Sequence, residues 1–62
     1  MRLYLVQIPP THDQGSHCMR FMCNRSEVRK EALWEYNSAR AHDGLEPIRR
    51  LPAGVTIRRA IP

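Results

Sequence analysis

The segment from residue 25 to residue 42 most constrains the fold, because it reads as one long helix in a chain of 62 residues. Asn24 precedes it as an N-cap with Glu27 three positions later, and Gly44 follows it as a C-terminal stop. At 100° per residue, the apolar side chains gather within about 80° of arc, with Leu33 at the border. The stripe consists of Val28, Ala32, Tyr36 and Ala39. This narrow stripe predicts a helix that packs closely on a sheet.

Two segments ahead of the helix have the period-two pattern of β-strands. Residues 2–8 carry apolar side chains on both faces, which is typical of a central strand. Residues 17–23 alternate as well, and place Met19, Phe21 and Cys23 on one face, with Phe21 as the expected core anchor. These segments predict two strands joined by a polar connection.

The C-terminal region, residues 48–60, supplies the remaining strand or strands. Residues 55–60 are rich in β-forming side chains, and Ile48 with Leu51 suits a short additional strand. The sequence therefore predicts a single α+β domain over residues 1–62. The expected order is β-β-α-β with a possible fourth strand, and the helix packs on a short antiparallel sheet.

Size and motif content limit the functions open to this chain. Its core contributes only about 3–5 kcal/mol, and a ligand pocket usually takes roughly 300–1,000 Å³. No nucleophile elbow or phosphate-cradling loop occurs in the sequence. We therefore predict a non-enzymatic protein without a cofactor, stabilised further by a partner or by forming a homodimer.

No apolar run is long enough for a membrane span and no signal-peptide pattern follows the N-terminus, which indicates a cytoplasmic protein.

The chain has few side chains that could hold a metal ion. The candidate ligands are His12, His17, Cys18, Cys23 and His42. Structural zinc sites usually combine two ligand pairs, whereas this chain has one cysteine pair and no second one. Alternation along the strand also turns Cys18 and Cys23 to opposite faces, which disfavours both a shared metal and an intrachain disulfide. We predict no metal site, and a metal-stabilised module is the weakest alternative.

Positive charge is concentrated in the last third of the chain. The ten basic and six acidic residues give a net charge of +4, and the helical segment is balanced in charge. The surplus cations are Arg49, Arg50, Arg58 and Arg59. They predict affinity for nucleic acid or for an acidic protein surface, although strand alternation places the last two on opposite faces. The alternative is an arginine-rich edge strand that keeps the protein soluble.

Trp34 is the most unusual residue of the helix, because it lies about 180° from the centre of the apolar stripe. Tryptophan is a frequent hot-spot residue of protein interfaces, so we predict that it anchors a partner. Lys30, Glu31 and Arg40 are the expected polar rim. In the alternative interpretation the C-terminal segment covers the indole with Leu45, Ile48 or Ile61.

Residues 1–40 resemble the small accessory proteins that bacteriophages encode. Many such proteins begin as Met1–Val6 does, and continue with an Arg-Phe strand and a capped, arginine-rich helix. Arg20-Phe21 and Asn24–Lys30 are similar to those two features. The resemblance implies a stoichiometric binding protein of phage or mobile-element origin that acts in the host cytoplasm.

The same resemblance implies inhibition or modulation of a larger host protein or ribonucleoprotein complex, with an anti-CRISPR role as its most concrete version. Many such inhibitors are acidic mimics of DNA, whereas this chain is basic, so we expect it to dock on acidic protein or on guide RNA. The alternative function is that of a small basic regulator that binds nucleic acid through its arginine-rich C-terminal strand.

Overall fold

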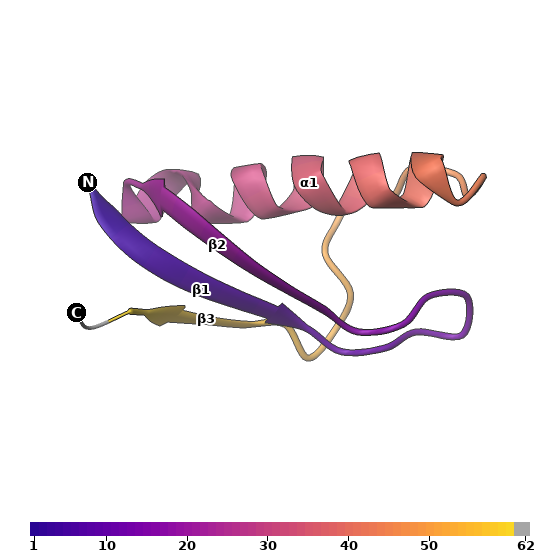
Figure 1. Cartoon of the computed structure of the whole chain (residues 1–62), viewed down its shortest axis with the longest axis horizontal. Helices are drawn as coiled ribbons and strands as arrows, with labels where there is room; N and C mark the ends of the chain where they lie inside the picture. Colours follow the sequence, from indigo (N-terminus) through magenta and orange to yellow (C-terminus); the bar gives the residue numbers. More distant parts are fainter. Residues whose placement is uncertain (61–62) are drawn as a thin grey trace.

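The computed structural model describes residues 1–60, in which one helix lies across a three-stranded sheet (Figure 1). The elements are β1 (Arg2–Ile8), β2 (His17–Cys23), the short 3₁₀ helix η1 (Arg25–Glu27), α1 (Val28–His42) and β3 (Thr56–Arg59). The strand order is β2-β1-β3, and both pairs are antiparallel. This architecture confirms the predicted α+β class and the β-β-α-β order.

Strand β1 is the central strand, as its two apolar faces predicted. Val6 lies opposite Met19 of β2 on one side and opposite Ile57 of β3 on the other. Tyr4 lies opposite Phe21 of β2 on the same face of the sheet. This row of side chains faces α1, so that the core forms between the helix and one face of the sheet.

The core is small and uses Val28, Ala32 and Tyr36 of the predicted helical stripe, whereas Ala39 is only partly buried. Its buried members are Tyr4, Val6, Ile8, Cys23, Val28, Ala32 and Tyr36. Phe21, which we expected as the core anchor, is only partly buried and packs against this cluster from the edge strand β2. Tyr36, fully buried at the middle of α1, is the largest of the completely buried side chains.

The two ends of the helix differ in how well they match expectation. The side chain of Asn24 makes no cap, because its Nδ2 donates to Oε1 of Glu27 at 3.2 Å rather than the side chain accepting from a backbone N–H. The backbone carbonyl of Asn24 accepts from the Glu27 N–H at 2.9 Å. Asn24 is therefore at the N-cap position, as predicted, but the side-chain cap expected of it does not form. Gly44 ends the helix as predicted, with a φ of 75° and the Leu45 N–H donating to the Arg40 carbonyl at 2.8 Å.

The fourth strand, expected around Ile48 and Leu51, is absent from the described residues. The backbone of Ile48 forms hydrogen bonds with the helix instead. The side chain of Asn37 accepts from the Ile48 N–H and donates to the Ile48 carbonyl, both at 2.9 Å. Ile48 thus has no free backbone group for a strand partner, and Pro47 and Pro52 remove further donors nearby.

Candidate binding surface

Trp34 lies in solvent on the outer side of α1, with 69% of its surface exposed. Val28, Ala32 and Tyr36 occupy the opposite side of the helix and are buried in the core. Of the two interpretations left open by the sequence, the structure supports the exposed indole. Of the three proposed covers, Ile48 packs against the core and Leu45 is not among the residues that surround the indole. The third, Ile61, lies outside the described residues.

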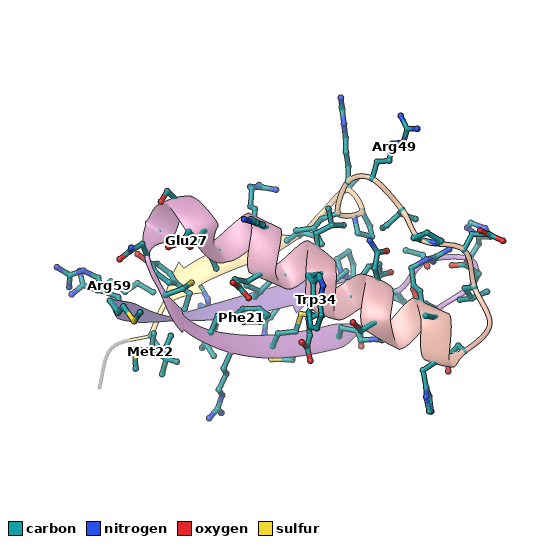
Figure 2. The ribbon with its side chains drawn as sticks, turned by 90° about the horizontal axis from the view of Figure 1, so that it is seen from above. Phe21, Met22, Glu27, Trp34, Arg49 and Arg59 are labelled. Atoms are coloured by element: carbon teal, nitrogen blue, oxygen red, sulfur yellow. The ribbon has the colours of Figure 1, made fainter. Side chains whose placement is uncertain are left out.

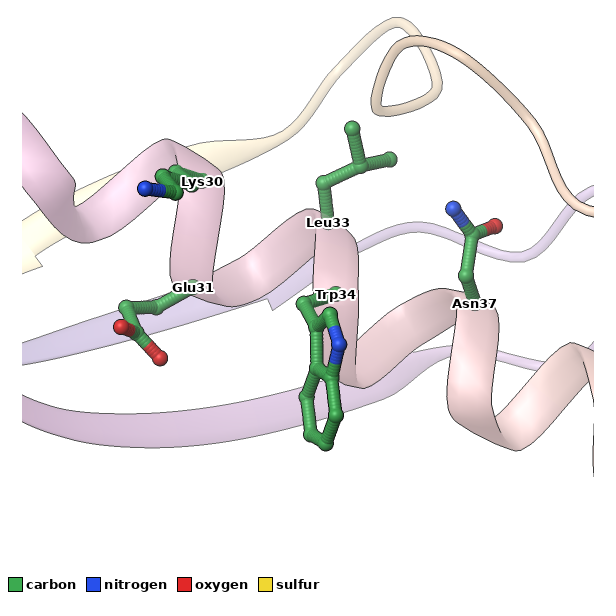
Figure 3. A pocket seen from close by; sticks show the side chains of 5 residues that line it. All are labelled: Lys30, Glu31, Leu33, Trp34 and Asn37. Carbon is green, nitrogen blue, oxygen red and sulfur yellow. The ribbon is translucent and has the colours of Figure 1, made fainter.

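The indole borders a shallow hollow on the helix surface. The hollow is lined by Lys30, Glu31, Leu33, Trp34 and Asn37, and Figure 3 shows how they lie. Leu33 and Asn37 point toward the loop that follows α1, whereas Trp34 and Glu31 point to the other side of the helix. Asn37 is held by its two bonds to Ile48, so this edge of the hollow is rigidly placed. We name this set of residues the tryptophan hollow.

Arg40 does not belong to this surface, contrary to our expectation of a polar rim. Only 7% of the residue is exposed. Its Nε donates to the Glu46 carbonyl at 2.6 Å, and one terminal nitrogen donates to Gln14 Oε1 at 3.0 Å and contacts Asp13 at 3.3 Å. Arg40 therefore ties the loop after β1 to the loop after α1. The predicted rim is reduced to Lys30 and Glu31.

A second hollow adjoins the first and is strongly basic. Its lining consists of Arg29, Lys30, Leu33, Arg49, Arg50 and Leu51, and we name it the basic hollow. Lys30 and Leu33 line both hollows, so the two form one continuous surface. Among residues 1–60 the ion pairs all involve Asp13, which leaves the four cations of the basic hollow without a carboxylate.

The four C-terminal arginines do not form a single patch. Arg58 pairs with Leu5 and Arg59 with Tyr4, so the two point to opposite faces of the sheet, as predicted. Arg49 and Arg50 lie in the loop before β3 and join Arg29 and Lys30 instead. Figure 2 shows Arg49 and Arg59 at well-separated places on the molecule.

The contribution of Arg29 was missed because the helical charges were summed along the segment rather than around its axis. At 100° per residue, Arg29 and Lys30 fall on one side of Trp34. Glu27, Glu31 and Glu35 fall on the other side, and all are exposed. The helix is neutral as a whole but divides into a basic and an acidic border, with the indole between them.

The predicted divergence of the two cysteines is confirmed. Cys18 is exposed, Cys23 is buried in the core, and both are free thiols. Burial raises the pKa of the Cys23 thiol, and the charges of Glu31 and Glu27 act in the same direction. In the described part of the chain, no three His, Cys, Asp or Glu side chains gather as a metal site requires.

The interior contains two polar atoms without a hydrogen-bond partner among the described residues, the Tyr36 hydroxyl and Nε2 of Gln14. The ring of His17 packs edge-on against Tyr36, with the ring centroids 5.0 Å apart. This part of the molecule is a polar edge of the core.

No helix within residues 1–60 has the length and apolar character needed to cross a membrane. No protein-family model, curated protein or solved structure matches the chain. The functional conclusion therefore depends on the geometry of the two hollows, and the resemblance to phage accessory proteins stays a prediction.

Proposed function

We propose that this protein is a non-enzymatic binding protein that docks on a larger protein or ribonucleoprotein complex through the tryptophan hollow. The observation that carries the proposal is Trp34, which is 69% exposed while the inner side of its helix completes the core. Burying an indole contributes up to a few kcal/mol of free energy. This contribution is large compared with the stability that so small a core supplies. A partner that covers Trp34 would recover this contribution.

The charges around Trp34 favour a protein partner over bare nucleic acid. Lys30 and the basic hollow lie on one side of the indole, and Glu31 lies on the other. A phosphate backbone that crossed this surface would meet the carboxylate as well as the cations. A protein surface can present acids and bases in the complementary order, which gives orientation and specificity to the contact.

The resemblance of residues 1–40 to phage accessory proteins supports one version of this function. In that version the protein inhibits a host defence or transcription complex, of which a CRISPR effector is the most concrete case. Such a complex can offer acidic protein and guide RNA close together. The tryptophan hollow would then contact protein, while the adjoining basic hollow would contact acidic side chains or RNA phosphates.

The test uses the tagged full chain as bait in a host-cell lysate, with and without nuclease. We expect a partner that stays bound after nuclease treatment. Trp34→Ala should weaken its binding by at least about 2 kcal/mol, the usual threshold of a hot spot. The matched control is His42→Ala, which removes another exposed ring from the same helix. Equal binding by the Trp34→Ala and parent proteins would contradict the proposal.

Direct binding of nucleic acid is a second candidate, which the basic hollow favours. Its four cations have no carboxylate partner among the described residues. Fluorescence polarisation with single- and double-stranded oligonucleotides should then show affinity that falls steeply with salt. Sub-micromolar binding at physiological salt, lost in an Arg49→Ala, Arg50→Ala variant and kept in Arg59→Ala, would place this candidate first.

A further inference from the structure

The sheet has a second face, which α1 does not cover. Figure 1 shows the helix on one side of the sheet, and no other element of residues 1–60 on the opposite side. Since Tyr4, Val6 and Ile8 point into the core, the alternate residues Leu3 and Leu5 point to this open side. Antiparallel sheets with one face in water usually carry polar side chains there, so two leucines on the central strand are unusual.

Apolar and charged side chains are ordered across this face by the strand register. Leu3 pairs with Met22, which is 61% exposed. Leu5 pairs with Arg20 of β2 on one side and with Arg58 of β3 on the other. The centre is thus apolar, and a cation stands on each flank. We name these five residues the outer sheet face.

No carboxylate balances the two arginines within the sheet. None of the three strands contains Asp or Glu, and the ion pairs among residues 1–60 involve neither Arg20 nor Arg58. Strands lie about 4.8 Å apart, so the two arginines start about 10 Å apart across the sheet. This separation is about the diameter of an α-helix with its side chains.

We propose that the outer sheet face binds an acidic amphipathic helix of a protein partner. The apolar stripe of that helix lies on Leu3, Leu5 and Met22. Carboxylates on both borders of the stripe pair with Arg20 and Arg58, which can hold them through two parallel hydrogen bonds each. The site lies on the side of the molecule away from Trp34, so this inference goes beyond the docking function proposed above.

Two other occupants fit this face less well. A second copy of the chain, packed face to face, would bring four guanidinium groups together without a carboxylate from any described strand. A single-stranded nucleic acid would find cations but no aromatic ring on which to stack its bases, since the outward positions of the strands carry none.

The experiment is a titration of the full chain with a designed peptide, followed by two-dimensional amide NMR spectra. The peptide is about 18 residues long, because shorter helices are marginal in water, and it has a leucine stripe bordered on both sides by Glu. We expect saturable shifts at Leu3, Leu5, Met22, Arg20 and Arg58. Arg20→Glu and Arg58→Glu should each weaken binding at least about tenfold.

Two controls separate this contact from general charge attraction. Arg25→Glu makes the same charge change on an exposed arginine of η1, outside the two hollows and the outer sheet face, and should leave the affinity within about twofold of the parent. A second peptide with Lys in place of Glu should bind the Arg20→Glu, Arg58→Glu double variant in preference to the parent protein. The native dispersion of each variant's spectrum checks that it is folded.

Three results would overturn the inference. One is the absence of saturable shifts, or shifts centred on Trp34 and Arg49 instead of the sheet. Another is a set of sheet shifts that grow with protein concentration alone, which would identify a second copy as the occupant. The third is a single-stranded oligonucleotide that moves the same amides more tightly than the peptide does. Each differs from failure of the Trp34 docking test, which concerns the other side of the molecule.

Discussion

At the scale of single residues, Arg40 is the one cation of the described part of the chain whose side chain is buried. Its guanidinium bonds to the Glu46 carbonyl, to Gln14 and to Asp13. A buried charge is tolerated only when such partners satisfy it, and removing one member leaves the others unpaired. Arg40 is therefore expected to matter for stability and not for recognition.

Arg40→Ala should lower the free energy of unfolding by about 2–4 kcal/mol, since it breaks a buried network that joins two loops. Urea denaturation followed by circular dichroism measures this loss. The control is Arg49→Ala, which removes an exposed arginine and should change stability by no more than about 0.5 kcal/mol. Equal stability of the two variants would show that the network contributes nothing.

Asp13 gives the same loop a dependence on pH. A hydrogen bond from the Thr11 hydroxyl, followed by the bond from Arg40, lowers the pKa of the Asp13 carboxyl from its ordinary value of 3.8. A lowered pKa in the folded state stabilises the protein above pH 3.8, and this contribution is lost as the pH falls through the folded-state pKa. Asp13→Asn should therefore flatten the acid limb of a curve of unfolding free energy against pH. An unchanged acid limb would exclude Asp13 from the transition.

At the scale of elements, the start of the helix depends on backbone geometry more than on a side-chain cap. The Asn24 amide reaches only the exposed Glu27 side chain, while its carbonyl makes the first bond of η1. Asn24→Ala keeps the carbonyl and should therefore cost less than about 0.5 kcal/mol, below the usual cost of about 1 kcal/mol for losing a cap. Thermal unfolding measures the difference. A loss of 1 kcal/mol or more would restore the capping role that the sequence suggested.

Most elements could be predicted from the sequence, because each depends on a local pattern. Residues 2–8 and 17–23 alternate clearly, and the structure begins and ends both strands at those residues. The expected strand at Ile48 could not be excluded in this way, because Asn37, which holds its backbone, is distant in sequence. Propensity describes a segment alone, whereas this hydrogen bond depends on the path of the loop.

The candidate site was predictable to a smaller degree. The position of Trp34 opposite the apolar stripe follows from the helical period alone, and the structure confirms it. Its exposure did not follow, because the path of the C-terminal segment is not set by the helical period. The burial of Arg40 does not follow, because its partners Asp13 and Gln14 come from a loop far away in the chain. The joining of Arg29 with Arg49 and Arg50 likewise depends on how the loop after α1 returns over the helix.

At the scale of the whole molecule, the two apolar surfaces that are at least partly exposed lie on opposite sides of a thin two-layer fold. Trp34 and the basic hollow occupy the helix side, and Leu3, Leu5 and Met22 occupy the sheet side. Exposed apolar patches usually mark interaction sites, and a core this small gains little stability of its own, so we expect partners to cover both surfaces. The fold of residues 1–60 therefore fits the two proposals made above, a docking surface on the helix side and a helix-binding surface on the sheet side.

The fluorescence of Trp34 tests the central claim most directly, because it is the single tryptophan of the chain. In the free protein, the emission spectrum and acrylamide quenching should match those of the urea-unfolded chain, since the indole is in water in both states. Addition of the partner captured from lysate should shift the emission to the blue and reduce the quenching, as expected when an interface buries the ring. A free protein with blue-shifted, protected emission, or a complex in which neither property changes, would contradict the assignment of Trp34 as the docking anchor.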